Sequence, residues 1–404
     1  MPRTFVVIGA NLAGGRAVET LRSEGFDGRI VLIGDEPSRP YERPPLSKEV
    51  VRGEKVADEV YLRPASFYEE QDIELRLGVG ATALDPSGTV TLADGAEIAF
   101  DACLLATGGR VRTLDVPGVD LAGVHYLRTL EDAIALATAL EAKPRVVVIG
   151  AGFIGAEFAA SARTVGCDVT MIEVLEVPLK RVLGDDIGAA YAQIHRDHGV
   201  DVRLGEGVER IEGGGRVEAV VGTSGTRYPA DLVVIGVGIA PNIELAQDAG
   251  ITCDNGIVVD ELCRTSHDKV FAAGDVAKRP DVYSGSSIRT EHFQNAQNMG
   301  PAAAKAMLGR GEPFREVPWF WSDQYDVNLQ MLGYTSPDVD RVVRGSFDER
   351  DAITFYLRGD TIVAATALNR GKDIAATRRL IERRAHVDRA KLGDDDVPLR
   401  QLLS

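Results

Sequence analysis

The sequence has few cysteines, and none stands in a redox or metal-binding pattern. The chain has 404 residues and four cysteines, Cys103, Cys167, Cys253 and Cys263, with no C-x-x-C pair among them. A zinc clamp or a dithiol centre needs closely spaced cysteines. A disulfide framework is also not expected in a chain this large with so few cysteines. The cysteine pattern therefore predicts a protein of a reducing cytoplasm with no metal site.

Basic residues are outnumbered by acidic ones. Lys and Arg total 45 and Asp and Glu total 61, which gives a net charge of −16. A nucleic-acid-binding protein needs a clustered excess of Lys and Arg to neutralise phosphates. We therefore expect no nucleic-acid partner, although an acidic protein partner could still bind a local basic patch.

Long hydrophobic runs are also lacking. The longest near-apolar stretch, residues 232–241, is far too short to span a bilayer. Residues 1–4 lead directly into an apolar strand pattern, without the apolar region and cleavage site of a secretory signal. The sequence therefore predicts a soluble protein with no membrane association.

Glycine, in contrast, is abundant. The chain has 43 glycines in 404 residues, which exceeds the typical share of ~7%. Surplus glycine in a folded chain indicates tight turns and close approach of the backbone to a ligand such as phosphate.

The chain contains one pattern twice. Phe-Val-Val-Ile-Gly-Ala-Asn-Leu-Ala-Gly at 5–14 is repeated as Val-Val-Val-Ile-Gly-Ala-Gly-Phe-Ile-Gly at 146–155. Each copy begins with a β-branched run, which is typical of a strand buried on both faces of a parallel sheet. A helix-forming segment and a second apolar strand follow each copy, at 15–22 and 29–33 and at 156–163 and 168–172. This double β-α-β pattern predicts two dinucleotide-binding domains of the doubly wound type.

Further buried strands are expected at 102–106, 232–235 and 270–273, each ending at a glycine-containing turn. The carboxyl ends of parallel strands are where such sheets bind ligands. The pattern changes near Val317, where an aromatic cluster is followed by strands expected at 353–357 and 361–365 and a basic helix at 374–384. We interpret this last part as a third, α+β domain.

The second copy carries the complete G-x-G-x-x-G motif. Gly150 makes the turn, Gly152 lets the backbone reach a pyrophosphate, and Gly155 permits close packing of helix on strand. Glu173 follows at the spacing expected of an acid that binds a ribose 2′-hydroxyl. A carboxylate repels a 2′-phosphate, so NADH is favoured over NADPH. The alternative is that Arg181 folds back to receive that phosphate.

The first copy departs from the motif, because Asn11 stands where the second glycine belongs. Asparagine tolerates left-handed backbone better than most residues, so we expect the turn to survive. Asp35 or Glu36 supplies the acid after the second strand.

Three other features have two interpretations from the residues alone. Asp275 could accept a hydrogen bond from a cofactor hydroxyl or cap the next segment. The cluster at 319–321 is more often core than cofactor contact. His195 and His198 lie three apart on an expected helix without an H-E-x-x-H motif, which favours a surface pair over a metal site.

Several motifs together resemble a known family. They are Pro-Tyr-Glu-Arg-Pro-Pro-Leu-Ser-Lys at 40–48, Ala-Thr-Gly-Gly at 106–109, Leu-Arg-Thr-Leu-Glu-Asp at 127–132, Gly-Val-Gly-Ile-Ala-Pro-Asn at 236–242, Ala-Gly-Asp at 273–275 and Trp-Phe-Trp-Ser-Asp-Gln at 319–324. In this order they resemble the FAD- and NAD(P)H-dependent ferredoxin reductases of bacterial haem monooxygenases and aromatic-ring dioxygenases. The resemblance covers essentially the whole chain.

The resemblance implies a site for each cofactor. NADH should use Gly150, Gly152, Gly155 and Glu173. Lys48 and Glu157 should meet beside the reactive flavin nitrogen, and Trp321 should lie over or near the flavin where a ferredoxin approaches. FAD should contact Gly9, Ala13, Gly14, Asp35, Arg43, Lys48, Ala81, Arg128, Asp275 and Phe293.

The implied fold is that of glutathione reductase: α/β, with two Rossmann-like dinucleotide-binding domains and a C-terminal α+β domain. The expected boundaries are 1–110 with 233–311 for a discontinuous FAD-binding domain, 111–232 for the NAD-binding domain and 312–404 for the C-terminal domain.

The implied function is transfer of hydride from NADH to FAD and then of single electrons to an acidic two-iron two-sulfur ferredoxin, in a transient complex, by a monomer or weak dimer. The alternatives are a rubredoxin or small-molecule reductase of the monodehydroascorbate kind, and a non-enzymatic flavoprotein redox sensor. A thiol-dependent relative needs a cysteine near residues 43–48, and none is there. The candidates for a ferredoxin-binding basic patch are Arg289, Lys305, Arg310, Arg341 and Arg344.

Overall fold

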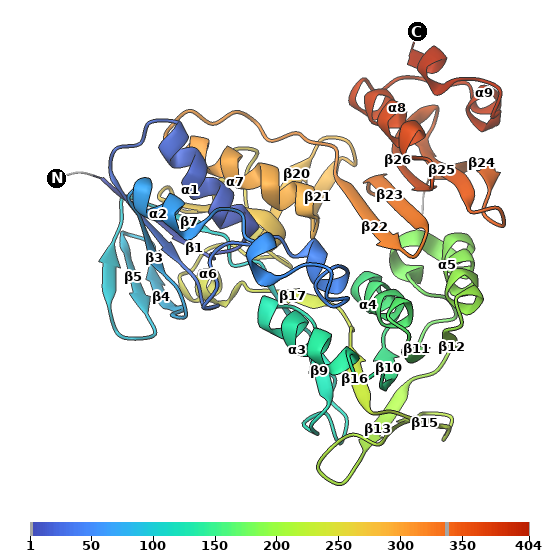
Figure 1. The fold of residues 1–404 in the computed structure, drawn as a ribbon. Coiled ribbons are helices and arrows are strands. Elements are labelled where there is room, and N and C mark those ends of the chain that lie inside the picture. Colours follow the sequence, from blue (N-terminus) through green and yellow to red (C-terminus); the bar gives the residue numbers. More distant parts are fainter. Residues whose placement is uncertain (1–2, 336–338, 404) are drawn as a thin grey trace. The chain divides into compact units, whose positions relative to one another are not determined.

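The computed structural model describes residues 3–335 and 339–403, and the chain forms two compact units (Figure 1). The first unit comprises Met1–Glu42, Val60–Arg110 and Ala240–Phe320. The second comprises Arg43–Glu59, Val111–Ile239 and Trp321–Ser404. Both units are discontinuous in sequence. The three-domain division expected from the sequence stays a prediction.

The first unit is built on a five-stranded parallel sheet of order β19-β7-β1-β2-β3. The central strand is β1, so the loop that follows it emerges in the middle of the sheet. After their first residues, β1 and β2 are fully buried, as their β-branched runs predict. The strands are β1 (Thr4–Ile8), β2 (Arg29–Ile33), β3 (Ile73–Arg76), β7 (Ala102–Leu105) and β19 (Val270–Ala272).

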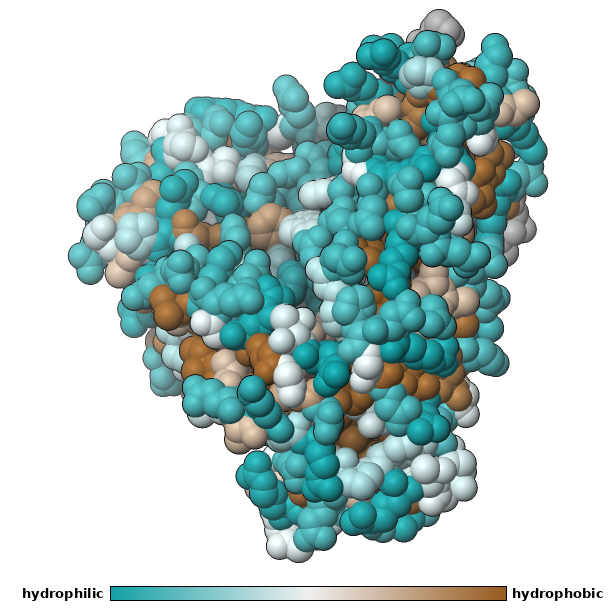
Figure 2. All heavy atoms as spheres, turned by 45° about the vertical axis from the view of Figure 1, so that its right-hand side comes forward, coloured by the Kyte–Doolittle hydropathy of each residue, from teal (hydrophilic) through white to brown (hydrophobic). Residues whose placement is uncertain are grey.

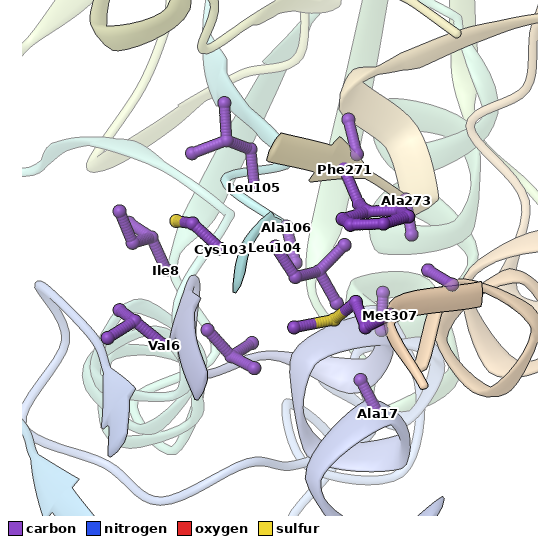
Figure 3. Close-up of a cluster of buried hydrophobic side chains, with 14 of the residues drawn as sticks. Val6, Ile8, Ala17, Cys103, Leu104, Leu105, Ala106, Phe271, Ala273 and Met307 are labelled. Atoms are coloured by element: carbon purple, nitrogen blue, oxygen red, sulfur yellow. The ribbon is translucent and has the colours of Figure 1, made fainter. Parts of the chain in front are cut away.

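Two helices, α1 (Leu12–Ser23) and α7 (Phe293–Met307), lie side by side in this unit (Figure 1). A Cβ at Gly300 of α7 would lie 2.2 Å from the Ala13 carbonyl oxygen of α1, so this contact requires glycine. Figure 3 shows the core, in which side chains of β1, β7 and β19 meet those of the two helices. The packing fixes the start of α1 against the sheet.

Smaller elements complete the first unit. They are the antiparallel strands β4 (Ala81–Asp85), β5 (Thr89–Leu92) and β6 (Glu97–Ala99), the sheet of β18 (Ile257–Val258), β20 (Ala277–Asp281) and β21 (Ser286–Arg289), the helices α2 (Ala65–Glu70) and α6 (Glu244–Asp248), and the 3₁₀ turn η3 (Gly274–Val276).

The second unit repeats the parallel arrangement, in the order β12-β11-β10-β16-β9. The strands are β9 (Val124–Tyr126), β10 (Arg145–Ile149), β11 (Asp168–Glu173), β12 (Asp201–Leu204) and β16 (Leu232–Ile235). The helices are α3 (Leu130–Leu140), α4 (Phe153–Thr164) and α5 (Lys180–Asp197), and α5 is interrupted at Gly184. A small antiparallel sheet contains β13 (Val208–Glu212), β14 (Ala219–Gly222) and β15 (Arg227–Pro229).

The C-terminal part contains an antiparallel sheet of order β22-β23-β26-β25-β24. Its strands are β22 (Trp319–Gln324), β23 (Val327–Gly333), β24 (Asp340–Ser346), β25 (Asp351–Arg358) and β26 (Thr361–Leu368), followed by the helices α8 (Gly371–Glu382) and α9 (Arg389–Gly393). The segments Pro44–Ser47, Ala57–Glu59 and Leu399–Leu403 are 3₁₀ turns, and β8 (Gly109–Val111) and β17 (Ile239–Pro241) are short strands. These findings confirm the expected α/β class with an α+β C-terminal part.

The helices after the glycine motifs begin earlier than expected. The first helical residues predicted from the sequence are 15 and 156, whereas α1 begins at Leu12 and α4 at Phe153. The third glycine of each motif therefore lies inside the first helical turn. The basic helix expected at 374–384 spans Gly371–Glu382. Within residues 3–335 and 339–403, no helix combines the length and hydrophobicity needed to cross a membrane.

Candidate functional site

The loop between β1 and α1 is the first candidate phosphate site. Gly9 has a φ of +117°, and a Cβ there would lie 2.1 Å from the Ala106 carbonyl oxygen. A Cβ at Gly14 would lie 2.0 Å from the carbonyl oxygen of Gly9. No side chain fits at either position, so the start of α1 lies directly against the end of β1. The unbonded N–H groups at such a helix start favour an anion.

Asn11 does not take the left-handed conformation that the sequence suggested. Its φ is −109° and its ψ is −161°, which is extended backbone open to any residue, and Gly9 makes the turn instead. The Asn11 amide donates to Glu36 Oε1 at 3.4 Å. The loop can therefore hold asparagine in place of the second glycine, because its backbone there is extended and the Asn11 side chain lies against Glu36.

The two acids after β2 have different surroundings. Glu36 accepts hydrogen bonds from the Asn11 amide and from the Tyr41 hydroxyl. Asp35 is exposed, and its Oδ1 accepts from the Glu36 N–H at 3.0 Å. Of the two candidates for a ribose hydroxyl, Asp35 is thus the accessible one.

The loop between β10 and α4 has the same construction. Gly150 has a φ of +97°, and a Cβ there would lie 2.5 Å from the Gly236 carbonyl oxygen. A Cβ at Gly155 would lie 2.0 Å from the Gly150 carbonyl oxygen. At Gly152 the nearest atom to a Cβ would be the Gly236 carbonyl oxygen at 3.9 Å, so this position faces space that the chain itself leaves open.

Glu173 ends β11 and closes this loop. Its Oε2 accepts from the Ala151 N–H at 2.7 Å, and its Oε1 accepts from the Leu175 N–H at 3.0 Å. The carboxylate is therefore fixed beside the glycine turn. Arg181, the alternative phosphate ligand, is exposed in the first turn of α5.

The other expected FAD residues lie in several elements. Ala81 starts β4, Asp275 lies in η3 and Phe293 starts α7, and all three are half-buried in the first unit. The Asp275 carbonyl oxygen accepts from Arg289 at 3.1 Å. In the second unit, the Arg43 guanidinium donates to the Arg128 carbonyl oxygen, which brings those two predicted residues together.

A buried ion pair lies in the second unit. Lys48 Nζ is 2.9 Å from Glu157 Oε2, and the two side chains are only 10% and 4% exposed. The Ser47 hydroxyl donates to the same oxygen at 2.5 Å, and the Ser322 hydroxyl donates to Glu157 Oε1 at 2.7 Å. The Lys48–Glu157 contact predicted from the resemblance is present, and both carboxylate oxygens have hydrogen-bond donors.

The expectation that His195 and His198 form a surface pair is wrong for His195, which is fully buried. Its Nε2 lies 2.9 Å from Gln324 Oε1 and its Nδ1 lies 3.1 Å from the Tyr325 hydroxyl. His198 is half-buried and stacks on the Tyr325 ring at 3.7 Å. The helical spacing was correct, but the helix face that carries His195 packs against β22 and the turn after it, which the sequence did not reveal.

Three functional candidates that were not predicted individually from the sequence are Ser47, Ser322 and Gln324. Each is buried and hydrogen-bonded to Glu157 or to a residue that binds it. Trp321 precedes Ser322 on β22 and is half-buried. The available signal was their position, because all three lie in segments that carry the family resemblance.

The four cysteines are free, and three of them are buried. Burial raises the pKa of the Cys103 thiol and raises that of Cys263 to about 12. A reactive thiol needs the opposite shift. The cysteines therefore give no support to a thiol-dependent mechanism.

The expected basic patch is only partly available. Arg344 is 3% exposed and donates to the carbonyl oxygens of Leu392 and Lys391, so it cannot contact a partner. Lys305 and Arg310 both pair with Glu24 and Arg341 pairs with Asp186, but all three side chains are about half-exposed, at 48%, 62% and 54%. On the face in Figure 2, hydrophilic residues predominate and hydrophobic residues form small groups between them.

Acid is expected to destabilise the protein through two histidines, the fully buried His195 and the half-buried His292. Burial lowers the pKa of His195 to about 4, partly opposed by its bond to Gln324, and burial lowers that of His292 to about 4. The unfolded chain protonates these residues near pH 6.5. The free energy of unfolding should therefore fall between pH 6.5 and pH 4, by about 3 kcal/mol for each histidine.

Urea unfolding of the wild type and of His195→Phe at pH 7 and pH 4 measures this effect. The variant should lose less stability on acidification, whereas His386→Gln, which replaces an exposed histidine, should behave as the wild type. An equal loss in His195→Phe and wild type would contradict the assignment.

Comparisons with known proteins agree with this geometry. Residues 3–300 match the family model for pyridine nucleotide-disulphide oxidoreductases, and residues 319–403 match the reductase C-terminal model. Rhodocoxin reductase of Rhodococcus erythropolis is 40% identical over 98% of this chain and 93% of its own. The ferredoxin–NAD(+) reductase component of the anthranilate 1,2-dioxygenase system of Burkholderia cepacia is 42% identical over 99% of both. The crystal structure of a covalent putidaredoxin reductase–putidaredoxin complex matches with a TM-score of 0.96 and 38% identity, over 99% of this chain and 98% of that one.

Proposed function

Because this chain belongs to the pyridine nucleotide-disulphide oxidoreductase family, we propose that it is an NADH-dependent ferredoxin reductase of an oxygenase system. FAD and NAD(H) are its cofactors, and it is an oxidoreductase. It takes hydride from NADH and passes single electrons to an acidic two-iron two-sulfur ferredoxin that feeds a haem monooxygenase or a ring-hydroxylating dioxygenase. We place it in the cytoplasm, as a monomer or weak dimer.

The chain's own residues fit the two cofactors. Gly152 faces open space beside a helix start, which suits the NADH pyrophosphate, and Glu173 lies next to that turn. For FAD, the equivalent loop at Gly9 and Gly14 has the same close-packed turn, and Asp35 is exposed. The remaining FAD ligands that we propose are Ala13, Arg43, Lys48, Ala81, Arg128, Asp275 and Phe293.

The Lys48–Glu157 pair is the observation that carries this proposal. A bound flavin couples a two-electron hydride donor to a one-electron acceptor. Lys48 supplies a buried positive charge for that chemistry, and Glu157 with the Ser47 hydroxyl fixes its position. No cysteine occupies residues 43–48, where a thiol-dependent relative needs one. Trp321 is the aromatic residue that we place at the electron exit.

The test is an assay of the purified protein with NADH or NADPH as donor and two-iron two-sulfur ferredoxins as acceptors, beside the flavin absorption spectrum. Rapid turnover with a ferredoxin and a preference for NADH are expected. Turnover only with rubredoxin or a small acceptor, or slow reduction to a long-lived charge-transfer complex, would replace the proposal with one of its alternatives.

Ferredoxin binding is expected to weaken with salt. An acidic ferredoxin can bind a chain of net charge −16 only through local basic residues, and such contacts are screened as ionic strength rises. The apparent Michaelis constant for ferredoxin should rise about tenfold or more between low and high salt, whereas that for NADH should change less. A constant that does not change with salt would exclude electrostatic docking.

A further inference from the structure

A row of buried polar side chains leads from Glu157 to the Tyr325 hydroxyl within the second unit. Gln324 Nε2 donates to Ser322 Oγ at 3.1 Å, and the Ser322 hydroxyl donates to Glu157 Oε1 at 2.7 Å. At the other end, His195 lies 2.9 Å from Gln324 Oε1 and 3.1 Å from the Tyr325 hydroxyl. Ser322, Gln324 and His195 are each no more than 1% exposed.

The direction of every hydrogen bond in this row follows from the charge on Glu157. A carboxylate paired with Lys48 only accepts, so the Ser322 hydroxyl must donate to it. Ser322 Oγ then accepts from the amide nitrogen of Gln324, which leaves the Gln324 oxygen to accept from His195 Nε2–H.

The histidine end of the row is fixed in the same way. A neutral histidine that donates from Nε2 must accept at Nδ1, so the Tyr325 hydroxyl donates to it. Burial lowers the pKa of His195 to about 4, which keeps the ring neutral near pH 7. All donors in the row therefore point toward Glu157.

We propose that Ser322, Gln324 and His195 are positioning residues that orient the Glu157 carboxylate on Lys48 through this one-directional row. A charged acceptor strengthens each bond that points toward it. Any role of Glu157 in hydride transfer rests on the proposed function. The existence and direction of the row do not, because they follow from the hydrogen bonds described above. Gln324 orients the row but does not relay protons, because its amide nitrogen only donates hydrogen bonds and its amide oxygen only accepts them.

The proposal predicts the tautomer of His195 and its reversal by a distant substitution. In Glu157→Gln, the amide oxygen should face the Lys48 ammonium, so the amide nitrogen should face Ser322. Ser322 must then donate to Gln324, whose amide turns over and donates to His195 Nε2. The His195 proton should move from Nε2 to Nδ1.

The measurement is ¹⁵N NMR of the FAD-bound protein with labelled histidine, because protonated and unprotonated ring nitrogens have well-separated shifts. The chain has six histidines, and the signals lost in His195→Phe assign the residue. We expect the Nε2–H form in the wild type and the Nδ1–H form in Glu157→Gln. Glu209→Gln, at an exposed position, should keep the wild-type form.

A second variant keeps the test decisive if Glu157→Gln does not fold. Gln324→Leu cuts the row, so His195 should lose the fixed Nε2–H form and show a mixture of both. Gln193→Leu, an exposed glutamine on the same helix, should not change it. A wild-type Nδ1–H form, or an unchanged tautomer in both row variants, would overturn the proposal. FAD content and reduction by NADH are recorded on the same samples, so a failure of the proposed function is seen separately.

Discussion

Lys48→Met is expected to lower the free energy of unfolding by about 3–5 kcal/mol, because it leaves the Glu157 charge buried without its partner. The Ser47 and Ser322 hydroxyls remain on the carboxylate but carry no compensating charge. Loss of the positive charge that we place beside the flavin should also slow its reduction by NADH about 100-fold. Urea unfolding and stopped-flow absorbance measure the two effects.

Two further variants separate charge from packing. Lys48→Met with Glu157→Gln removes both charges and should regain most of the lost stability without restoring the rate. Lys55→Met removes a 38% exposed lysine 4.0 Å from Glu49, so it should cost at most about 1 kcal/mol. If Lys48→Met reduced its flavin at the wild-type rate, the proposed role of Lys48 would be wrong.

Gly152→Ala is expected to abolish NADH binding at ordinary concentrations while leaving the fold intact. The backbone there is extended, with φ −73° and ψ 180°, and a Cβ would meet no chain atom closer than 3.9 Å. Only a ligand's pyrophosphate would meet the added methyl group. The dissociation constant for NADH should rise about 100-fold or more, a loss of about 3 kcal/mol.

Gly155→Ala is the matched comparison. Its Cβ would lie 2.0 Å from the Gly150 carbonyl oxygen, so the loop must move, and stability should fall by about 1–3 kcal/mol or more along with NADH affinity. Titration with NADH and thermal unfolding of both variants distinguish the two glycines, and the flavin spectrum of Gly152→Ala should remain that of the wild type. Unchanged NADH affinity in Gly152→Ala would remove the loop from the NADH site.

The parallel sheets could be predicted from sequence because their signals are local. The β-branched runs at β1 and β10 and the glycine spacing after them specify a buried strand, a turn and a helix within about twenty residues. The Lys48–Glu157 contact needed the family resemblance, because the two residues are over a hundred positions apart and neither carries a local signal.

The row from Glu157 to Tyr325 could not be predicted. Gln324 follows Asp323, and His195 precedes Arg196, so both would be expected to face solvent without knowledge of which faces pack together. Asn11 shows a similar limit: its residue type suggested a left-handed turn, but the geometry of Gly9 decides the loop. Tertiary contacts override such local preferences.

The surroundings of Glu157 have a consequence for synthesis on the ribosome. Donors to its carboxylate come from Ser47, Lys48 and Ser322, so a nascent chain has two of them early and lacks the third until synthesis passes β22. A chain truncated before that strand lacks the Ser322 donor to Glu157 Oε1, so that oxygen would have to bind water instead. A C-terminal segment without Ser322 must therefore supply another hydrogen-bond donor to Glu157 Oε1 or leave that oxygen to water.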